Sequence, residues 1–257
     1  MKKRIFFFIA GCFMLTGFLL PASPGIGKFY WQGQYKNGEK GFVVMELFTS
    51  QGCSSCPPAD DILGNYASSA DAHIIPLSFH VDYWNKLGWK DPFSSILFTQ
   101  RQQQYASLFQ LESIYTPQLV INGTRELVGS EEGRIGEIVN GFLKEPPAAE
   151  ITITNKVVRG TKLEISYALN KNLQGKMMNA VLVQDKITTR IRAGENRGLN
   201  LVNHNIVLDL QEMRISGTAG NIYLQMPAGQ LTDGLSMVLF VQDPGTGKIS
   251  GAVKQKL

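Results

Sequence analysis

Hydrophobic and polar positions divide the chain into two regions with different patterns. Between residues 40 and 146, apolar runs of strand length alternate with stretches in which apolar residues recur every three or four positions, as on one face of a helix. After Pro147, short alternating stretches are separated by polar turns, a pattern typical of antiparallel strands. The pattern therefore predicts an α/β region followed by an all-β region.

The first region has the predicted element order βαβαββα. The expected strands and helices are, in chain order, a strand at 41–48, a helix around 59–67, a strand at 73–81, a helix around 96–109, strands at 118–121 and 126–128, and a helix at 135–142. Asn122 and Gly123 are typical of the tight turn that joins two hairpin strands. Glu145-Pro146-Pro147 ends this region, so we expect one domain at 40–146.

The second region contains about seven short strands and no amphipathic helix. They are expected at 151–154, 163–167, 180–183, 205–208, 222–224, 237–241 and 249–253. Such a series is typical of an antiparallel sandwich. We therefore expect a second, sandwich-like all-β domain at 148–257.

The N-terminus has the pattern of an export signal. Basic residues at 1–4 precede an apolar stretch at 5–20, and small residues and prolines follow at 21–25. We interpret residues 1–25 as a signal peptide and expect a periplasmic or secreted protein. Two alternatives remain open, which are lipid attachment at Cys12 and an uncleaved N-terminal anchor.

Most of the excess positive charge lies in that segment. The chain has a formal charge of +4, and without residues 1–22 it keeps 22 basic and 21 acidic side chains. A nearly neutral chain without a later Lys/Arg cluster has no broad field that attracts nucleic acid. We therefore expect no nucleic-acid partner, and membrane contact only through the N-terminal anchor or lipid.

Cys53 and Cys56 form a Cys-x-x-Cys pair at the turn from the first strand to the first helix. This spacing allows a disulfide, because Cα atoms three residues apart at a helix start are about 5 Å apart. The pattern is shared by redox motifs and by half of a zinc site, but a second cysteine pair is absent. The redox interpretation makes Cys53 the exposed nucleophile and Cys56 the buried resolving thiol. The alternative is a permanently closed structural disulfide.

Three motifs give the chain a family resemblance. They are the segment Glu46 to Asp60 around the cysteines, His80-Val81-Asp82-Tyr83-Trp84 with Leu87-Gly88-Trp89, and Tyr115-Thr116-Pro117-Gln118. With them the chain resembles the secreted thioredoxin-like family catalogued as domain of unknown function 1223, over most of residues 40–257. The resemblance implies a thioredoxin-like first domain and export, and it implies no activity. It also implies a cis peptide bond between Thr116 and Pro117, beside the cysteines, where a substrate backbone pairs with Thr116.

Other polar and aromatic residues are candidates for the same site. Glu46 is an acid within an apolar strand, and it either relays protons to the thiols or faces solvent at an edge. His80, Asp82, Trp84 and Trp89 follow the second strand, whose carboxyl end should lie beside the cysteine turn. We expect them either to line a substrate groove, with His80 and Asp82 as proton donor and acceptor, or to form a packed aromatic cover.

A polar segment of the second region, Ala193-Gly194-Glu195-Asn196-Arg197-Gly198, is bounded by glycines. It is either a docking surface or an ordinary turn of the sandwich.

These features lead to one main functional hypothesis and two alternatives. The main hypothesis is an exported thiol:disulfide oxidoreductase that needs no cofactor and acts on a thiol- or disulfide-containing exported protein. The first alternative is a binding module, either for Cu(I) with His80 as a third ligand or with a purely structural disulfide. The second is a peroxidase-like role based on Ser50, three residues before Cys53, although the rest of that motif is missing.

Overall fold

The computed structural model describes residues 40–69, 71–228 and 233–257. All of them belong to one compact unit, residues 33–257. The expected signal peptide at 1–25 lies outside the described residues. Among the helices of the described ranges, none has the length and apolar character needed to cross a membrane.

The first region has the predicted element order, with one additional short helix, η1. Its elements are β1 (Val43–Thr49), α1 (Pro57–Ser68), β2 (Ile74–His80), η1 (Asn85–Leu87), α2 (Ile96–Phe109), β3 (Gln118–Ile121), β4 (Arg125–Val128) and α3 (Glu132–Phe142). Pro57 and Pro58 lie in the first turn of α1, where a proline removes no intrahelical hydrogen bond.

The second region contains the seven expected strands. They are β5 (Ile151–Arg159), β6 (Lys162–Leu169), β7 (Met177–Arg190), β8 (Asn200–Arg214), β9 (Ala219–Gln225), β10 (Leu235–Gln242) and β11 (Ile249–Lys256). β7 and β8 contain 14 and 15 residues and are much longer than the sequence pattern indicates. Their connection, residues 191–199, therefore lies far from the centre of the ribbon they form.

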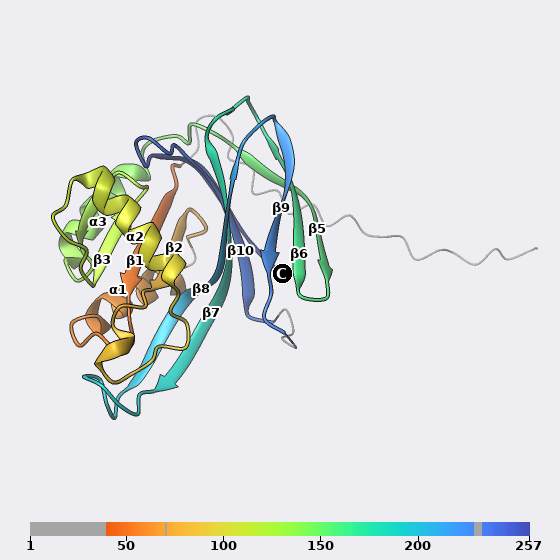
Figure 1. Ribbon diagram of the computed structural model, residues 1–257. Helices are drawn as coiled ribbons and strands as arrows, with labels where there is room; N and C mark the ends of the chain where they lie inside the picture. Colours follow the sequence, from red (N-terminus) through yellow and green to blue (C-terminus); the bar gives the residue numbers. More distant parts are fainter. Residues whose placement is uncertain (1–39, 70, 229–232) are drawn as a thin grey trace, which may run out of the picture. The chain divides into compact units, whose positions relative to one another are not determined.

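The strands form a mixed eight-stranded sheet and an antiparallel three-stranded sheet (Figure 1). The large sheet has the order β11-β10-β7-β8-β2-β1-β3-β4, and the small sheet has the order β5-β6-β9. The two regions expected as separate domains thus share one sheet, joined where β2 pairs in parallel with β8 at Ser78 and Ile206. The physical reason is that β2 would otherwise expose an unpaired edge, which β8 covers.

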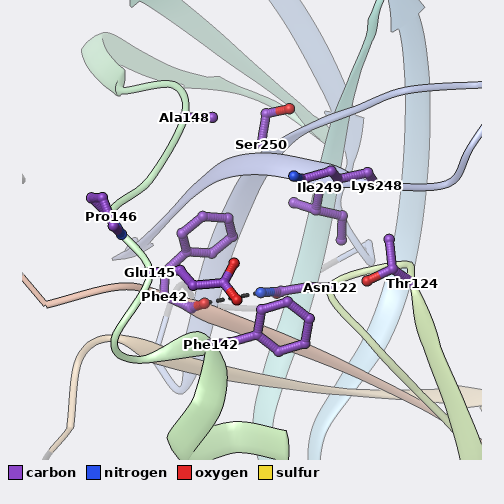
Figure 2. Close-up of a pocket in the computed structure, with 10 residues that line it drawn as sticks. All are labelled: Phe42, Asn122, Thr124, Phe142, Glu145, Pro146, Ala148, Lys248, Ile249 and Ser250. Atoms are coloured by element: carbon purple, nitrogen blue, oxygen red, sulfur yellow. Dashed lines mark hydrogen bonds between the residues drawn. The ribbon is translucent and has the colours of Figure 1, made fainter.

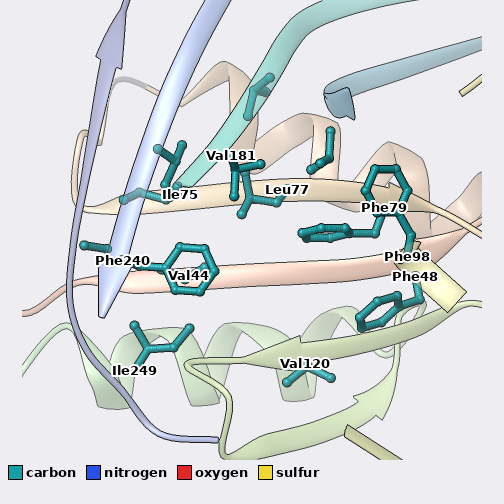
Figure 3. Close-up of a cluster of buried hydrophobic side chains, with 14 of the residues drawn as sticks. Val44, Phe48, Ile75, Leu77, Phe79, Phe98, Val120, Val181, Phe240 and Ile249 are labelled. Atoms are coloured by element: carbon teal, nitrogen blue, oxygen red, sulfur yellow. The ribbon is translucent and has the colours of Figure 1, made fainter. Parts of the chain in front are cut away.

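Side chains on the two faces of β1 belong to different hydrophobic clusters. Val44 and Phe48 belong to a cluster that also contains residues of the second region, such as Val181 and Phe240 (Figure 3). Met45 and Leu47 point to the opposite face and pack with residues of α1 and α3. Because side chains alternate along a strand, Glu46 lies on the α2 face and Thr49 on the α1 face.

A third cluster contains residues of both sheets in the second region. Leu163 and Ile165 of β6 belong to it together with Leu182 of β7 and Leu239 of β10. The alternating pattern of β6 therefore corresponds to a strand that buries one face, whereas β10 is buried on both faces.

Candidate functional site

Cys53 and Cys56 form a disulfide at the turn between β1 and α1. The Cα atoms are 5.4 Å apart, in agreement with the distance expected from the spacing. Backbone hydrogen bonds from Cys53 N to Ser50 O and from Cys56 N to Cys53 O define the turn. We refer to residues 50–56 as the disulfide turn.

Both cysteines are completely buried, with 0% exposed surface each. The expectation that Cys53 is exposed is therefore wrong, although Ser54 and Ser55 between the cysteines are exposed. The reason is that segments distant in sequence cover the disulfide turn, as the contacts below describe. In this state a partner thiolate cannot reach either sulfur.

Thr116 and Pro117 lie directly against the disulfide. The Thr116 hydroxyl donates a hydrogen bond to Cys53 Sγ at 3.3 Å, and the Thr116–Pro117 peptide bond is cis, as the resemblance implied. The indole N–H of Trp84 donates to the same hydroxyl at 2.8 Å. Trp84 is thus connected to Cys53 through a single hydroxyl group.

Trp89 holds the other side of the disulfide turn. Its indole N–H donates to Gln51 Oε1 at 3.2 Å. The Gln51 amide nitrogen donates to Thr189 Oγ1 of β7 and to Asn203 Oδ1 of β8, both at 3.0 Å. In this state the tryptophans form a packed cover and not an open groove, which is the second of the two expected arrangements.

The glycine-bounded segment at 193–198 reaches the disulfide turn. Asn196, only 3% exposed, donates from Nδ2 to Gln51 O at 3.0 Å and to Cys53 O at 2.9 Å. Ser54 N donates to Glu195 Oε2 at 3.1 Å. Sequence reasoning did not connect this segment with the cysteines, since it lies about 140 residues away, and its polar character was the only available signal.

His80 is paired with Asp91 and not with Asp82. His80 Nδ1 and Asp91 Oδ2 are 2.7 Å apart, and both side chains are fully buried. Asp82 instead accepts a hydrogen bond from Thr99 at 2.6 Å, so the two residues expected as proton donor and acceptor have separate partners. The reason is that Asp82 follows β2 toward the start of α2, whereas Asp91 returns beneath the disulfide turn and accepts from Gln51 N at 2.8 Å.

A second buried acid, Asp60, lies one helical turn after Cys56. Burial raises the pKa of Asp60 to about 7, although His80 and a hydrogen bond from Thr49 partly oppose the shift. Burial alone would lower the pKa of His80, but Asp91 and Asp60 raise it above its usual value. Burial tends to raise the pKa of Asp91, but His80 holds it below its usual value. Within the described residues, the buried His80 Nε2 has no hydrogen-bond partner.

Glu46 lies on the opposite face of β1 and bonds a different set of groups. Its carboxylate accepts from Arg101 Nε at 2.5 Å and Nη2 at 3.1 Å, and from the Tyr105 hydroxyl at 2.5 Å. Arg101 also donates to Glu212 of β8 and Gln242 of β10. Glu46 is therefore buried and paired, so it does not face solvent at an edge. A proton relay at Glu46 stays a prediction, and Asp60 is a second buried acid, in the helix that begins at the disulfide turn.

Two pockets lie away from the disulfide. A cavity of about 50 Å³ is found near the start of β1, where Asn122 Nδ2 donates to Phe42 O at 3.0 Å (Figure 2). It is far smaller than the roughly 300 to 1,000 Å³ typical of ligand sites. A pocket of about 470 Å³ lies beside α2, but Arg101 and Glu212 in its lining are already bonded to each other. Within the described part of the chain, no three His, Cys, Asp or Glu side chains are grouped as metal ligands.

Comparison with known proteins gives a family and a related fold. No curated protein matches the chain in sequence. The crystal structure of protein AGR_C_4864 from Agrobacterium tumefaciens is 26% identical, with a TM-score of 0.62, and the match covers 84% of this chain and 94% of that one. A β-glucosidase from Kluyveromyces marxianus in complex with glucose matches with 13% identity and a TM-score of 0.21, over 48% of this chain and 16% of that one, which is too weak to carry an argument. The model of the family described as protein of unknown function, DUF1223, matches residues 44–242, and the chain belongs to that family.

Proposed function

We propose that this chain is an exported thiol:disulfide oxidoreductase whose disulfide is closed under a cover in the described state. In this proposal the first region is thioredoxin-like, and residues 1–25 direct export. The observation that carries the proposal is the hydrogen bond from Thr116 to Cys53 Sγ at 3.3 Å. A hydroxyl donor at a sulfur stabilises the thiolate that forms when a disulfide opens.

The proposed reaction is an exchange with a partner dithiol. A partner thiolate attacks Cys53 Sγ, the bond between the two sulfurs breaks, and Cys56 leaves as a thiolate that takes up a proton. A second partner thiolate then attacks the partner sulfur of the mixed disulfide, and Cys53 leaves as a thiolate. The chain is thereby reduced and the partner oxidised, and the reverse sequence of steps oxidises the chain.

Asp60 is the group we propose as the proton donor and acceptor for Cys56. It lies on the first turn of α1, where its backbone N–H donates to Cys56 O at 3.1 Å. A buried acid with a pKa of about 7 can give and accept a proton near neutral pH. His80 and Asp91 adjust this pKa through their charges.

A second candidate function is a structural disulfide that never opens in the folded protein. The complete burial of both sulfurs favours it. However, a four-residue loop gains little stability from closure. In addition, a structural disulfide has no need of Asp60 and His80, whose burial costs free energy unless they are paired. Groups with shifted pKa values beside a sulfur pair are more typical of a reactive site.

The soft-metal alternative needs reduced thiols and a third donor. His80 was its expected third ligand; Asp91 holds Nδ1 of this side chain, so Nε2 is the ring nitrogen that would bind the metal. Elemental analysis of the reduced protein for copper and zinc separates a metal carrier from an oxidoreductase, since the proposal expects neither metal in stoichiometric amount.

The test of the proposal is to trap the exchange partner. In Cys56→Ser the resolving thiol is missing, so Cys53 should accumulate in mixed disulfides with exported proteins, which are detected as reducible complexes and identified by mass spectrometry. The matched control is Cys53→Ser, which should trap far less. If neither variant forms a complex above the level of a double cysteine variant, the structural disulfide is the better account.

A further inference from the structure

Side chains from the 193–198 loop hold the backbone of the disulfide turn. Asn196 Nδ2 bonds the carbonyl oxygens of Gln51 and Cys53, at 3.0 and 2.9 Å. Glu195 Oε2 accepts from Ser54 N at 3.1 Å. Three hydrogen bonds therefore connect the turn to the loop between β7 and β8.

The same loop also packs against the aromatic segment that covers the sulfurs. A Cβ atom placed on Gly194 would lie 3.1 Å from Trp89 Cβ and 3.4 Å from Trp89 N. Gly194 has a φ of 74°, which other residues adopt with strain. Close contact between this loop and Trp89 thus depends on glycine at this position.

Disulfide exchange requires a nucleophile to approach a sulfur in line with the bond that breaks. Since both cysteines have no exposed surface, either the turn or its cover has to move first. Asn196 is buried and donates to two carbonyl groups, so separating it from the turn breaks two hydrogen bonds in one step. Glu195 adds a negative charge at the residue after Cys53, which disfavours a thiolate there.

We propose that Asn196 is a positioning residue of the Cys53–Cys56 site, and that release of the 193–198 loop from the disulfide turn admits the attacking thiolate. A partner that displaces this loop uncovers Cys53 and removes the Glu195 carboxylate from its vicinity in the same movement. The inference rests on the proposed function, because it describes how the site of that function becomes accessible.

The test is the rate at which dithiothreitol reduces the disulfide in the folded full-length chain, measured by alkylation and mass spectrometry. Asn196→Asp has the same shape but replaces the donor with an oxygen that repels both carbonyl groups, and Asn196→Ala removes the donor. Loss of two hydrogen bonds should accelerate reduction roughly 30-fold. The matched control is Arg197→Ala, the exposed neighbour, which should react at the wild-type rate.

If Asn196 had a purely structural role, its substitution would lower the thermal unfolding temperature. The reduction rate, measured well below that temperature, would then stay the same. Rates within twofold of wild type in folded Asn196→Asp and Asn196→Ala would overturn the inference. If both variants fail to fold, Gly194→Ala provides the second test, because its strain and its contact with Trp89 push the loop away from the turn while Asn196 stays. An unchanged rate in folded Gly194→Ala would then overturn the inference.

The reduction experiment and the trapping experiment test the two proposals independently. Dithiothreitol needs no protein partner, so faster reduction without trapped complexes supports the role of Asn196 and contradicts the proposed oxidoreductase. Trapped complexes with unchanged reduction rates support the oxidoreductase and contradict the role of Asn196.

Discussion

Two buried charged clusters lie on opposite faces of β1, and they differ in how completely their polar groups are paired. On the α2 face, each of the three nitrogens of Arg101 donates to an acceptor, among them Glu46. On the α1 face, His80 Nε2 has no partner within the described residues, and the pKa of Asp60 is about 7. In the first cluster the charged side chains are fully paired, and the unpaired atom is an amide nitrogen, Nδ2 of Asn179. In the second, the unpaired atom belongs to the titratable ring of His80.

The difference indicates what each cluster does. A buried network whose charged groups are all paired fixes the elements that it joins, here α2 with strands of both regions. A buried network with an unpaired imidazole nitrogen and an acid whose pKa is near neutral is costly for stability and is typical of a reactive site. Of the two clusters, only the one on the α1 face is adjacent to the disulfide turn, through Asp91 and Gln51.

The largest expected effect is the loss of the Arg101 cluster. Arg101→Met leaves the buried carboxylate of Glu46 without its cation, and breaking a buried ion pair in this way costs about 3 to 5 kcal/mol. Urea unfolding followed by circular dichroism measures the loss. The matched control is the double variant Arg101→Met with Glu46→Leu, which should recover most of the stability. A loss below about 1 kcal/mol in Arg101→Met would contradict a structural role.

The next effect is a pH-dependent change in the free energy of unfolding, expected for the cluster that contains Asp60. The raised pKa of Asp60 means that the folded state binds its proton more tightly, so the contribution of Asp60 to stability falls between about pH 4 and pH 7 and is then constant. Asp60→Asn lacks this penalty. The free energies of unfolding of Asp60→Asn and wild type should be similar at pH 4. At pH 8 that of Asp60→Asn should be higher by several kcal/mol, since one pKa unit corresponds to about 1.4 kcal/mol. A difference independent of pH would show that Asp60 does not titrate in this range.

A smaller effect is expected at Thr116. Thr116→Val keeps the shape of the side chain but removes the donor to Cys53 Sγ and the acceptor of the Trp84 indole. We expect a loss of about 1 to 2 kcal/mol and a higher Cys53 thiol pKa in the reduced protein, measured by the pH dependence of alkylation. The control is Thr124→Val, since Thr124 lies in the β3 and β4 turn. An unchanged pKa of the Cys53 thiol in Thr116→Val would show that Thr116 does not stabilise the thiolate.

Local patterns in the sequence were sufficient for the elements and for part of the site. Apolar runs predicted strands buried on both faces, such as β1, and helical or alternating periodicities predicted elements that bury one face. The Cys53 and Cys56 pair and the Thr116-Pro117 segment were identified from their motifs. Their burial was not, because it depends on side chains supplied by Trp84, Trp89 and the 193–198 loop.

The features that the sequence analysis missed depend on distant pairing. The shared sheet requires β8 to pair with β2, and no local pattern specifies that register. Asn196 reaches the disulfide turn only because β7 and β8 form a long ribbon. Asp60 was hidden within a motif and looked like an ordinary acidic residue of the first turn of a helix, where negative charge is favourable. Glu46 was correctly expected to be unusual, but its partner on α2 could not be identified from spacing.

The most direct test of the central claim is the rate of Cys53–Cys56 reduction in the folded wild-type chain as urea is raised from zero through the unfolding midpoint. Opening of a cover exposes little surface, so the account predicts a measurable rate that depends only weakly on urea well below the midpoint. A disulfide reduced only through global unfolding, with the full urea dependence of that transition at every concentration, would contradict the account.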